Sequence, residues 1–360
     1  MRKLLSIAVA LSLCAVGSVS AQEANTITLQ SENQVFGGLT YNPASNALLI
    51  SSATDGQIYQ VGSDGTLKPV IHSDELKSAA SISIDSTNNR LYAVSSSFGA
   101  LTNGQPPTGF PQGNGNGPQG GPPNGTPPAG FPADGNGPQP PNGTTPAGFP
   151  NDGQRPELSA NLFAFDLTSG KQIYTVDLTK IAPQGGGFIG QTVADASGNV
   201  YLTDSAASAV YRIDASGSPT YLSDEKFQAQ GMGIRGLAYD GTNLLVSKTV
   251  DGSLYRVKLS DGSVQTVTIN GAPASLGELA MLSDGRLAGI DRADSKIVIL
   301  NSTNQWQTAQ VSSTLDLTGN ATALAVNGTT LYALEAEGTP NNQGGQTPTM
   351  PQFTIVSFTL

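Results

Sequence analysis

The chain has 360 residues, of which 38% are hydrophobic and 12% charged, and it contains 43 glycines and 23 prolines. This length is enough for one large domain, and the high content of turn-forming residues disfavours helices and indicates an all-β fold. The net charge of −10, with 17 Lys and Arg residues, argues against nucleic acid or anionic lipid as a partner, because phosphate binding needs clustered basic side chains.

The N-terminal segment, residues 1–21, has the pattern of a signal peptide. Arg2 and Lys3 precede an apolar stretch at residues 4–16, and small residues at 19–21 match the site that signal peptidase cleaves. We therefore expect an exported protein, periplasmic or secreted, whose mature chain comprises residues 22–360 and has no transmembrane segment.

The only cysteine, Cys14, lies inside this segment, and the preceding Leu13 is not the small residue that a lipid-anchored cysteine requires. The mature chain then has no thiol. Disulfides, thiolate metal sites and cysteine nucleophiles are thereby excluded.

Short strands separated by tight turns fill most of the mature chain. Residues 26–29 form one isolated predicted strand, and six similar groups of strands follow, of which residues 188–214 are the clearest example. Corresponding positions in the six groups are Gly38, Ala80, Gln191, Gly236, Glu278 and Thr322. They are separated by about 42, 111, 45, 42 and 44 residues, and a repeat of this length is typical of a propeller with one four-stranded sheet per repeat. The sequence therefore predicts a six-bladed β-propeller over residues 22–360.

The one long step indicates an insertion in the second blade, which we place at residues 99–157. This insertion consists almost wholly of Gly, Pro, Asn, Gln and Thr, so it cannot bury enough apolar area to fold, and we expect it to be disordered. A shorter insertion at residues 339–352 interrupts the last blade. The longer segment is either a tolerated loop expansion or a contact to a protein or envelope component.

The sixth group lacks its fourth strand. Residues 26–29 are the candidate to complete it, so that the N-terminal strand joins the last blade and closes the ring. Asp-Gly pairs beginning at positions 55, 64, 251, 261 and 284 are interpreted as tight turns in which the glycine has positive φ, and not as calcium-binding loops.

The innermost strands of a propeller begin around a central channel, where a ligand is expected to bind. The ligand-binding residues predicted at the mouth of this channel are Gln191, Arg235, Glu278, Asp204, Lys248 and Asp291. Candidate catalytic residues are Glu278, Asp291 and Glu335, because carboxylates can hold a cation or transfer protons. Acids on such a rim are also commonly solvated or paired with Arg235 and Lys248.

Four segments carry a resemblance to a known family: GGLTYN from Gly37, TVADASGNVYLTDS from Thr192, IRGLAYDGTNLLVS from Ile234 and TLYAL from Thr330. In these segments the chain resembles the senescence marker protein/gluconolactonase/regucalcin group of six-bladed propellers. Its repeated pattern also resembles that of NHL-repeat and strictosidine-synthase-like proteins. The resemblance implies a divalent cation in the channel, held by a Glu, one or two Asn and an Asp, which polarises a lactone carbonyl and a water.

The family's metal-ligand positions fall on Gly37, Ala80, Gly190 and Arg235 in this chain. None supplies the oxygen ligands that a hard cation needs, and a guanidinium places a positive charge where the metal would lie. We therefore expect no metal site and no cofactor. The sequence favours a non-catalytic exported binding or scaffold protein for a small polar or anionic ligand. The alternative is a metal-dependent lactone or ester hydrolase with a non-standard site, and a divalent cation is expected only in that case.

Overall fold

The computed structural model describes residues 25–31, 33–96, 159–182, 186–229, 233–337 and 351–360. The chain divides into two compact units, Met1–Gly104 with Leu158–Leu360, and Gln105–Glu157. The second unit lies outside the described residues, as do the predicted signal peptide and the insertion at residues 99–157. The shorter predicted insertion is also outside them, except for its last two residues, Pro351 and Gln352, and Gln352 opens a strand.

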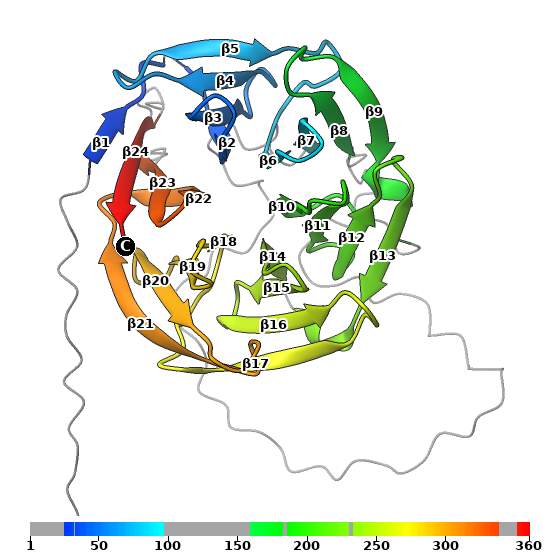
Figure 1. The fold of residues 1–360 in the computed structure, drawn as a ribbon, viewed down its shortest axis with the longest axis vertical. Coiled ribbons are helices and arrows are strands. Elements are labelled where there is room, and N and C mark those ends of the chain that lie inside the picture. Colours follow the sequence, from blue (N-terminus) through cyan, green and yellow to red (C-terminus); the bar gives the residue numbers. More distant parts are fainter. Residues whose placement is uncertain (1–24, 32, 97–158, 183–185, 230–232, 338–350) are drawn as a thin grey trace, which may run out of the picture. The chain divides into compact units, whose positions relative to one another are not determined.

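The first unit is a β-propeller, in which four four-stranded sheets and one eight-stranded sheet surround a common centre (Figure 1). The predicted all-β propeller is thus confirmed. The first three consecutive sheets comprise β2 (Phe36–Asn42), β3 (Ala47–Ser52), β4 (Ile58–Val61) and β5 (Leu67–Ile71); β6 (Ser81–Asp85), β7 (Arg90–Ser96), β8 (Ala160–Asp166) and β9 (Gln172–Asp177); and β10 (Ile189–Ala194), β11 (Val200–Asp204), β12 (Ala209–Ile213) and β13 (Pro219–Ser223).

The remaining strands form the eight-stranded sheet and the sheet that contains both ends of the described chain. In sheet order they are β14 (Ile234–Tyr239), β15 (Asn243–Lys248), β16 (Ser253–Lys258), β17 (Val264–Asn270), β21 (Thr308–Asp316), β20 (Lys296–Asn301), β19 (Leu287–Asp291) and β18 (Leu279–Met281); and β1 (Asn25–Thr28), β24 (Gln352–Thr359), β23 (Thr330–Glu337) and β22 (Asn320–Asn327). The described helices are two 3₁₀ turns, Leu178–Lys180 and Glu225–Phe227, and neither is long and apolar enough to cross a membrane.

Two strand pairings join strands that do not follow one another along the chain. The parallel pairing of β17 with β21, which includes Ile269 opposite Ala309, connects two four-stranded halves into the eight-stranded sheet. The antiparallel pairing of β1 with β24, which includes Ile27 opposite Ile355, adds the first described strand to the last sheet.

Within a sheet, the middle strands are more buried than the outermost one. All five residues of β11 are buried, because both faces of this middle strand pack against neighbouring sheets, whereas the outermost strand β13 is mostly exposed. Six clusters of buried hydrophobic residues fill the spaces between successive groups of four strands. The single tryptophan, Trp306, is 5% exposed and belongs to the cluster between β14–β17 and β18–β21.

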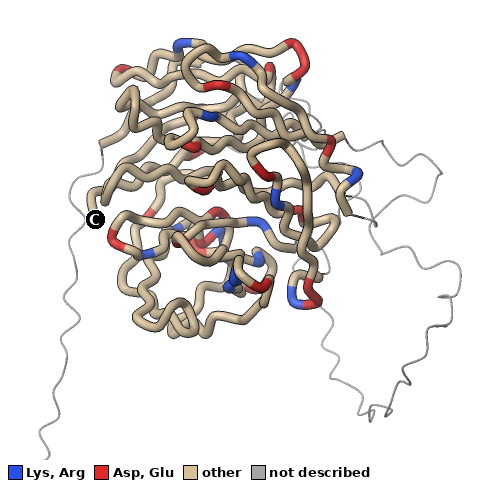
Figure 2. Tube along the Cα trace, turned by 45° about the vertical axis from the view of Figure 1, so that its right-hand side comes forward, with Lys and Arg blue, Asp and Glu red and all other residues tan. Residues whose placement is uncertain are grey.

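The Asp-Gly pairs form the tight turns that the sequence predicts. The glycine of each pair has positive φ: Gly56, Gly65, Gly252, Gly262 and Gly285. In each turn the aspartate also accepts a hydrogen bond from the backbone N–H two residues later, which fixes the turn locally. Figure 2 shows that many of the charged residues lie at such turns and at strand ends, which leaves the central parts of most strands apolar.

Candidate functional site

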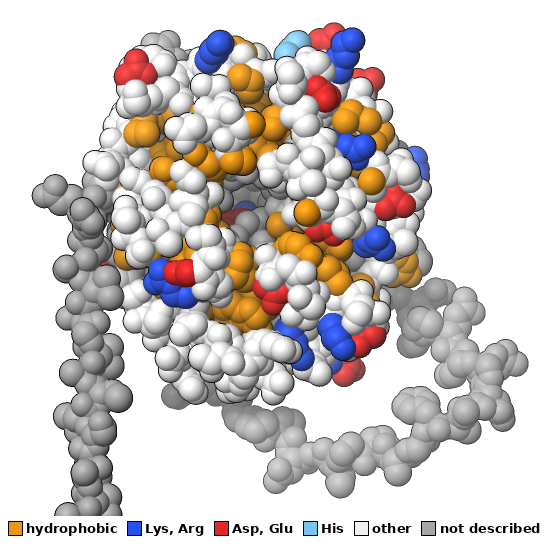
Figure 3. Space-filling view, in the orientation of Figure 1, with side chains coloured by type: hydrophobic (Ala, Val, Ile, Leu, Met, Phe, Trp, Pro, Cys, Tyr) orange, Lys and Arg blue, Asp and Glu red, His pale blue; other side chains and the backbone are white. Residues whose placement is uncertain are grey.

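A cavity of about 240 Å³ lies where the innermost strands β2, β6, β10, β14, β18 and β22 converge. Figure 3 shows a hollow at the centre of one face of the propeller, with charged atoms at its base and hydrophobic side chains around it. Three of the predicted ligand-binding residues line the cavity: Gln191, Arg235 and Glu278. These three residues lie at the cavity, and their part in ligand binding stays a prediction.

Hydroxyl groups on second strands, counted outward from the centre, hold the innermost strands close together. Thr203 Oγ1 accepts a hydrogen bond from the Gln191 backbone N–H at 3.2 Å and donates one to the Arg235 carbonyl at 2.5 Å. In the same way, the hydroxyl of Ser247 on β15 donates at 2.6 Å to the carbonyl of Gly277, which lies shortly before β18. These contacts fix the backbones from which Arg235 and its neighbours project into the cavity.

Glycines on the inner strands allow this close approach. A Cβ atom on Gly37 would lie 2.6 Å from the carbonyl oxygen of Ala80, and one on Gly190 would lie 2.5 Å from that of Arg235. Real Cβ atoms do not come this close to backbone oxygens, so neither position has room for a side chain. These are two of the four positions at which the resembled family carries metal ligands; of the other two, Ala80 has only a methyl group and Arg235 carries a cation. The residues present at these positions do not fit the divalent cation that the family resemblance implies.

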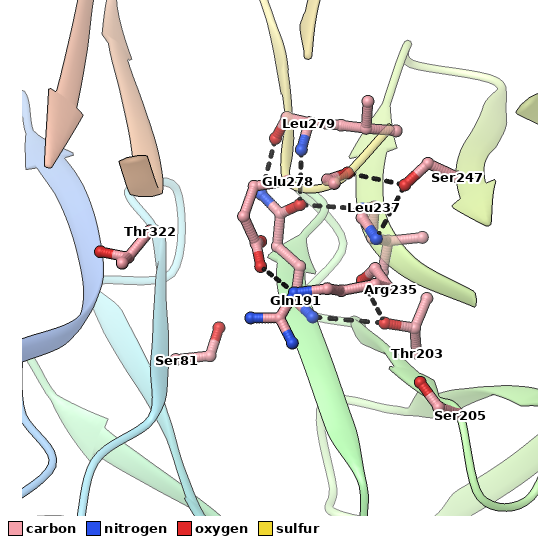
Figure 4. Close-up of polar contacts among 12 residues, drawn as sticks. Ser81, Gln191, Thr203, Ser205, Arg235, Leu237, Ser247, Glu278, Leu279 and Thr322 are labelled. Atoms are coloured by element: carbon pink, nitrogen blue, oxygen red, sulfur yellow. Dashed lines mark hydrogen bonds and ion pairs between the residues drawn. The ribbon is translucent and has the colours of Figure 1, made fainter. Parts of the chain in front are cut away.

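Arg235 and Glu278 form an ion pair at the cavity. Arg235 Nε lies 3.0 Å from Glu278 Oε1, and the two side chains are 29% and 8% exposed (Figure 4). The N–H direction does not meet hydrogen-bond geometry, so Arg235 Nε has no hydrogen-bond partner among the described residues. The carboxylate neutralises the guanidinium charge without accepting a hydrogen bond from Nε.

A second guanidinium, that of Arg292, also lines the cavity and was missed by the sequence analysis. Burial and the nearby positive charge of Arg235 lower the pKa of Arg292 to about 10, while Glu278 acts in the opposite direction. The buried Nε of Arg292 has no hydrogen-bond partner among the described residues. The available signal was its position directly after Asp291, a residue that had been predicted at the channel mouth.

Gln191 connects three inner strands through its side chain. Its carboxamide oxygen accepts hydrogen bonds from the backbone N–H groups of Leu237 at 2.9 Å and Leu279 at 2.8 Å. The amide nitrogen donates to the Leu279 carbonyl at 2.6 Å (Figure 4). The side chain thus reaches from β10 past the start of β14 to β18, and these contacts engage both ends of the amide.

Replacing Gln191 by methionine is expected to lower the free energy of unfolding by about 2 kcal/mol, because three backbone groups lose their partner and water in the cavity replaces it only in part. Urea unfolding followed by Trp306 fluorescence measures this loss. Gln310→Met, at an exposed position of β21, is the matched control and is expected to change the free energy by less than about 0.5 kcal/mol. Equal effects of the two substitutions would show that the inter-strand contacts contribute nothing.

Asp204 and Lys248 do not line the cavity. Asp204 accepts hydrogen bonds from the Gly187 backbone N–H at 2.7 Å and from the Tyr211 hydroxyl at 2.9 Å. Burial, and secondarily the Asp204 charge, raises the pKa of Tyr211. Lys248 Nζ lies 2.9 Å from Asp251 Oδ2. Lys248 Nζ also donates to the Lys226 carbonyl at 3.3 Å, so both side chains hold loops beside the end of a second strand.

The remaining candidate acids are also absent from the lining. Asp291 Oδ1 accepts a hydrogen bond from the backbone N–H of Ala293. Glu335 Oε2 accepts hydrogen bonds from the backbone N–H and hydroxyl of Thr318 and from the backbone N–H of Gly319. Of the three candidate catalytic residues, only Glu278 reaches the cavity. Within the described residues there is also no cluster of three or more His, Cys, Asp or Glu side chains suited to a metal ion.

No protein-family model and no curated protein matches the sequence. Among solved structures, the chain is similar to the major Malassezia sympodialis allergen Mala s 1, with a TM-score of 0.60 and 14% identity over 92% of this chain and 95% of that one. It is also similar to a gluconolactonase from Xanthomonas campestris, with a TM-score of 0.55 and 12% identity over 94% of this chain and 90% of that one.

A third similar structure is that of a catalytically inactive virginiamycin B lyase from Staphylococcus aureus with quinupristin, with a TM-score of 0.54 and 10% identity over 94% of this chain and 99% of that one. The gluconolactonase and lyase structures are β-propellers, which agrees with the fold of this chain. Similarities at such low identity concern the fold alone, since one fold carries many unrelated activities.

Proposed function

We propose that this protein binds a small anion in its central cavity and does not catalyse a reaction there. The observation that carries the proposal is the unequal charge of the lining. Its charged residues are Arg235, Arg292 and Glu278, so one positive charge of the lining has no counter-ion among the residues that the structure describes. The Nε atoms of both arginines have no hydrogen-bond partner among the described residues. An anion beside the two guanidiniums would supply the missing charge.

The proposed architecture is a six-bladed propeller of the gluconolactonase-like superfamily, closed between its first and last strands. This interpretation counts the eight-stranded sheet as two blades joined by β17 and β21, and it takes the pairing of β1 with β24 as the closure. Export, and a contact of residues 99–157 with a protein or envelope component, rest on the sequence patterns alone.

The lactone or ester hydrolase has less support than anion binding. The family's own metal positions include Gly37 and Gly190, where backbone oxygens of the next sheet leave no room for a side chain, so a metal would need other ligands. Of its candidate acids, Glu278 is paired with Arg235, and Asp291 and Glu335 bind backbone groups. No observation in the described structure favours this function over binding.

Isothermal titration calorimetry of the full chain with acetate and with inorganic phosphate tests the proposal. We expect saturable binding of at least one anion at pH 7, and about tenfold weaker binding by Arg235→Ala, because a charge-assisted hydrogen bond contributes about 1.5–3 kcal/mol. The matched control is Arg286→Ala, which removes the same charge from a turn where Arg286 pairs with Asp284. Absence of saturable binding, or equal losses in both variants, would overturn the proposal.

A further inference from the structure

We infer that the ligand is a small monocarboxylate with a compact apolar body, and not a hydroxylated acid or a dianion. This inference rests on the proposed function and specifies its ligand. It follows from the lining of the cavity, in which charged and apolar side chains lie on opposite walls.

The charged wall belongs to one half of the ring. Arg235 projects from β14, Glu278 directly precedes β18, and Arg292 directly follows β19, so all three come from adjacent elements. Gln191 adds an amide to this half, but its oxygen and nitrogen are bound to the backbones of Leu237 and Leu279. The guanidiniums of Arg235 and Arg292 are therefore the donors left for a ligand, and their excess charge over Glu278 is one. A single carboxylate balances that charge.

The opposite wall comes from β2, β6 and β22 and from the turns beside them. Its apolar lining residues include Val35, Phe36, Ala53, Ala80, Ala323 and Leu324. Figure 4 shows Ser81 and Thr322 on the side opposite the Arg235–Glu278 pair.

The hydroxyls of this wall are already engaged. Ser81 Oγ accepts a hydrogen bond from the Thr192 backbone N–H at 3.2 Å and lies 3.3 Å from the Thr192 hydroxyl. Thr322 Oγ1 donates to the Leu334 carbonyl at 3.4 Å. Hydroxyl groups on a ligand would lose water here without gaining free partners, whereas an apolar surface would gain from burial.

The volume sets the size of the ligand. A cavity of about 240 Å³ holds about eight water molecules at ~30 Å³ each, which corresponds to roughly eight or nine non-hydrogen atoms. Benzoate, benzamide and threonate each have about this size, and they separate the two features of the inference. Benzamide lacks the charge of benzoate, and threonate keeps the charge but replaces the apolar ring by hydroxyls.

Calorimetric titration of the full chain with these three compounds at pH 7 tests the inference. We expect benzoate to bind at least about tenfold more tightly than either threonate or benzamide. If threonate binds as well as benzoate, the ligand class is wrong while anion binding stands. If benzamide binds as well as benzoate, or if neither anion binds, the proposed function itself fails.

A pair of isosteric substitutions locates the apolar contact. Val35→Thr adds a hydroxyl to the cavity wall with little change in shape, and we expect it to weaken benzoate binding about three- to fivefold without weakening threonate. Val70→Thr is the matched control, because Val70 lies on the outer strand β5 and is 37% exposed. If the two variants bind benzoate equally well, Val35 and the apolar wall do not contact the ligand, and the inference is overturned.

Discussion

Replacing Gly236 by alanine is expected to lower the free energy of unfolding by about 3–4 kcal/mol. An alanine Cβ at this position would lie 2.0 Å from the Gly277 carbonyl oxygen and 2.5 Å from Ser247 Oγ. The Gly277 oxygen belongs to backbone that Ser247 holds by a hydrogen bond of 2.6 Å, so it cannot rotate away as a flexible side chain would. Overpacking of this kind costs about 1–3 kcal/mol, and separating the strands also weakens the hydrogen bonds of Ser247.

Urea unfolding measured by tryptophan fluorescence is well suited to this test, because the only tryptophan, Trp306, is packed between the same two groups of strands. The control is Gly241→Ala. Gly241 has a φ of +95°, and a Cβ atom added to it would meet nothing within 4 Å, so its substitution reports backbone conformation alone, at a cost of about 1 kcal/mol. If Gly236→Ala lowers the free energy of unfolding by no more than the control does, the inner strands can separate without loss of stability.

The fold was predictable because its signals are local and recur. An Asp-Gly pair specifies its own turn, and the spacing between Gln191, Gly236 and Glu278 repeats the length of one four-stranded sheet. The buried middle strands, such as β11, show themselves as short apolar runs. None of these signals requires knowledge of which residues meet across the ring.

The site was less predictable because a side chain near the centre can form hydrogen bonds with groups on several different strands. Gln191 has the position of a ligand-binding residue, yet it binds Leu279, 88 residues away. Asp204 has an equally suitable position, but the nearby backbone N–H groups and a tyrosine hydroxyl bind it instead. Strand position predicts which residues approach the channel, and the hydrogen bonds of the folded chain decide which of them remain available to a ligand.

Replacing Glu278 by glutamine is expected to strengthen anion binding about 20-fold, the opposite of the effect of Arg235→Ala. Glu278 is the negative charge in the cavity lining, and it repels any anion that approaches Arg235 and Arg292. Two unit charges about 5 Å apart interact by about 3 kcal/mol at an effective dielectric constant of about 20, and water in the open cavity reduces this to about 2 kcal/mol. Glutamine keeps the shape and an oxygen acceptor for Arg235.

The charge state of the arginines supports the direction of this effect. Glu278 raises the pKa of Arg292, so its loss lowers that pKa further below about 10, which still leaves the guanidinium protonated at pH 7. Both arginines then lack an internal counter-ion, and a ligand carboxylate takes its place. Titration with benzoate at pH 7 measures the gain, and Glu337→Gln, which removes an exposed charge at the end of β23, controls for the change in net charge. Damage to the fold would weaken binding, so it cannot explain tighter binding by Glu278→Gln. An affinity that is unchanged or lower, in a variant that remains folded, would show that the anion does not bind beside Glu278.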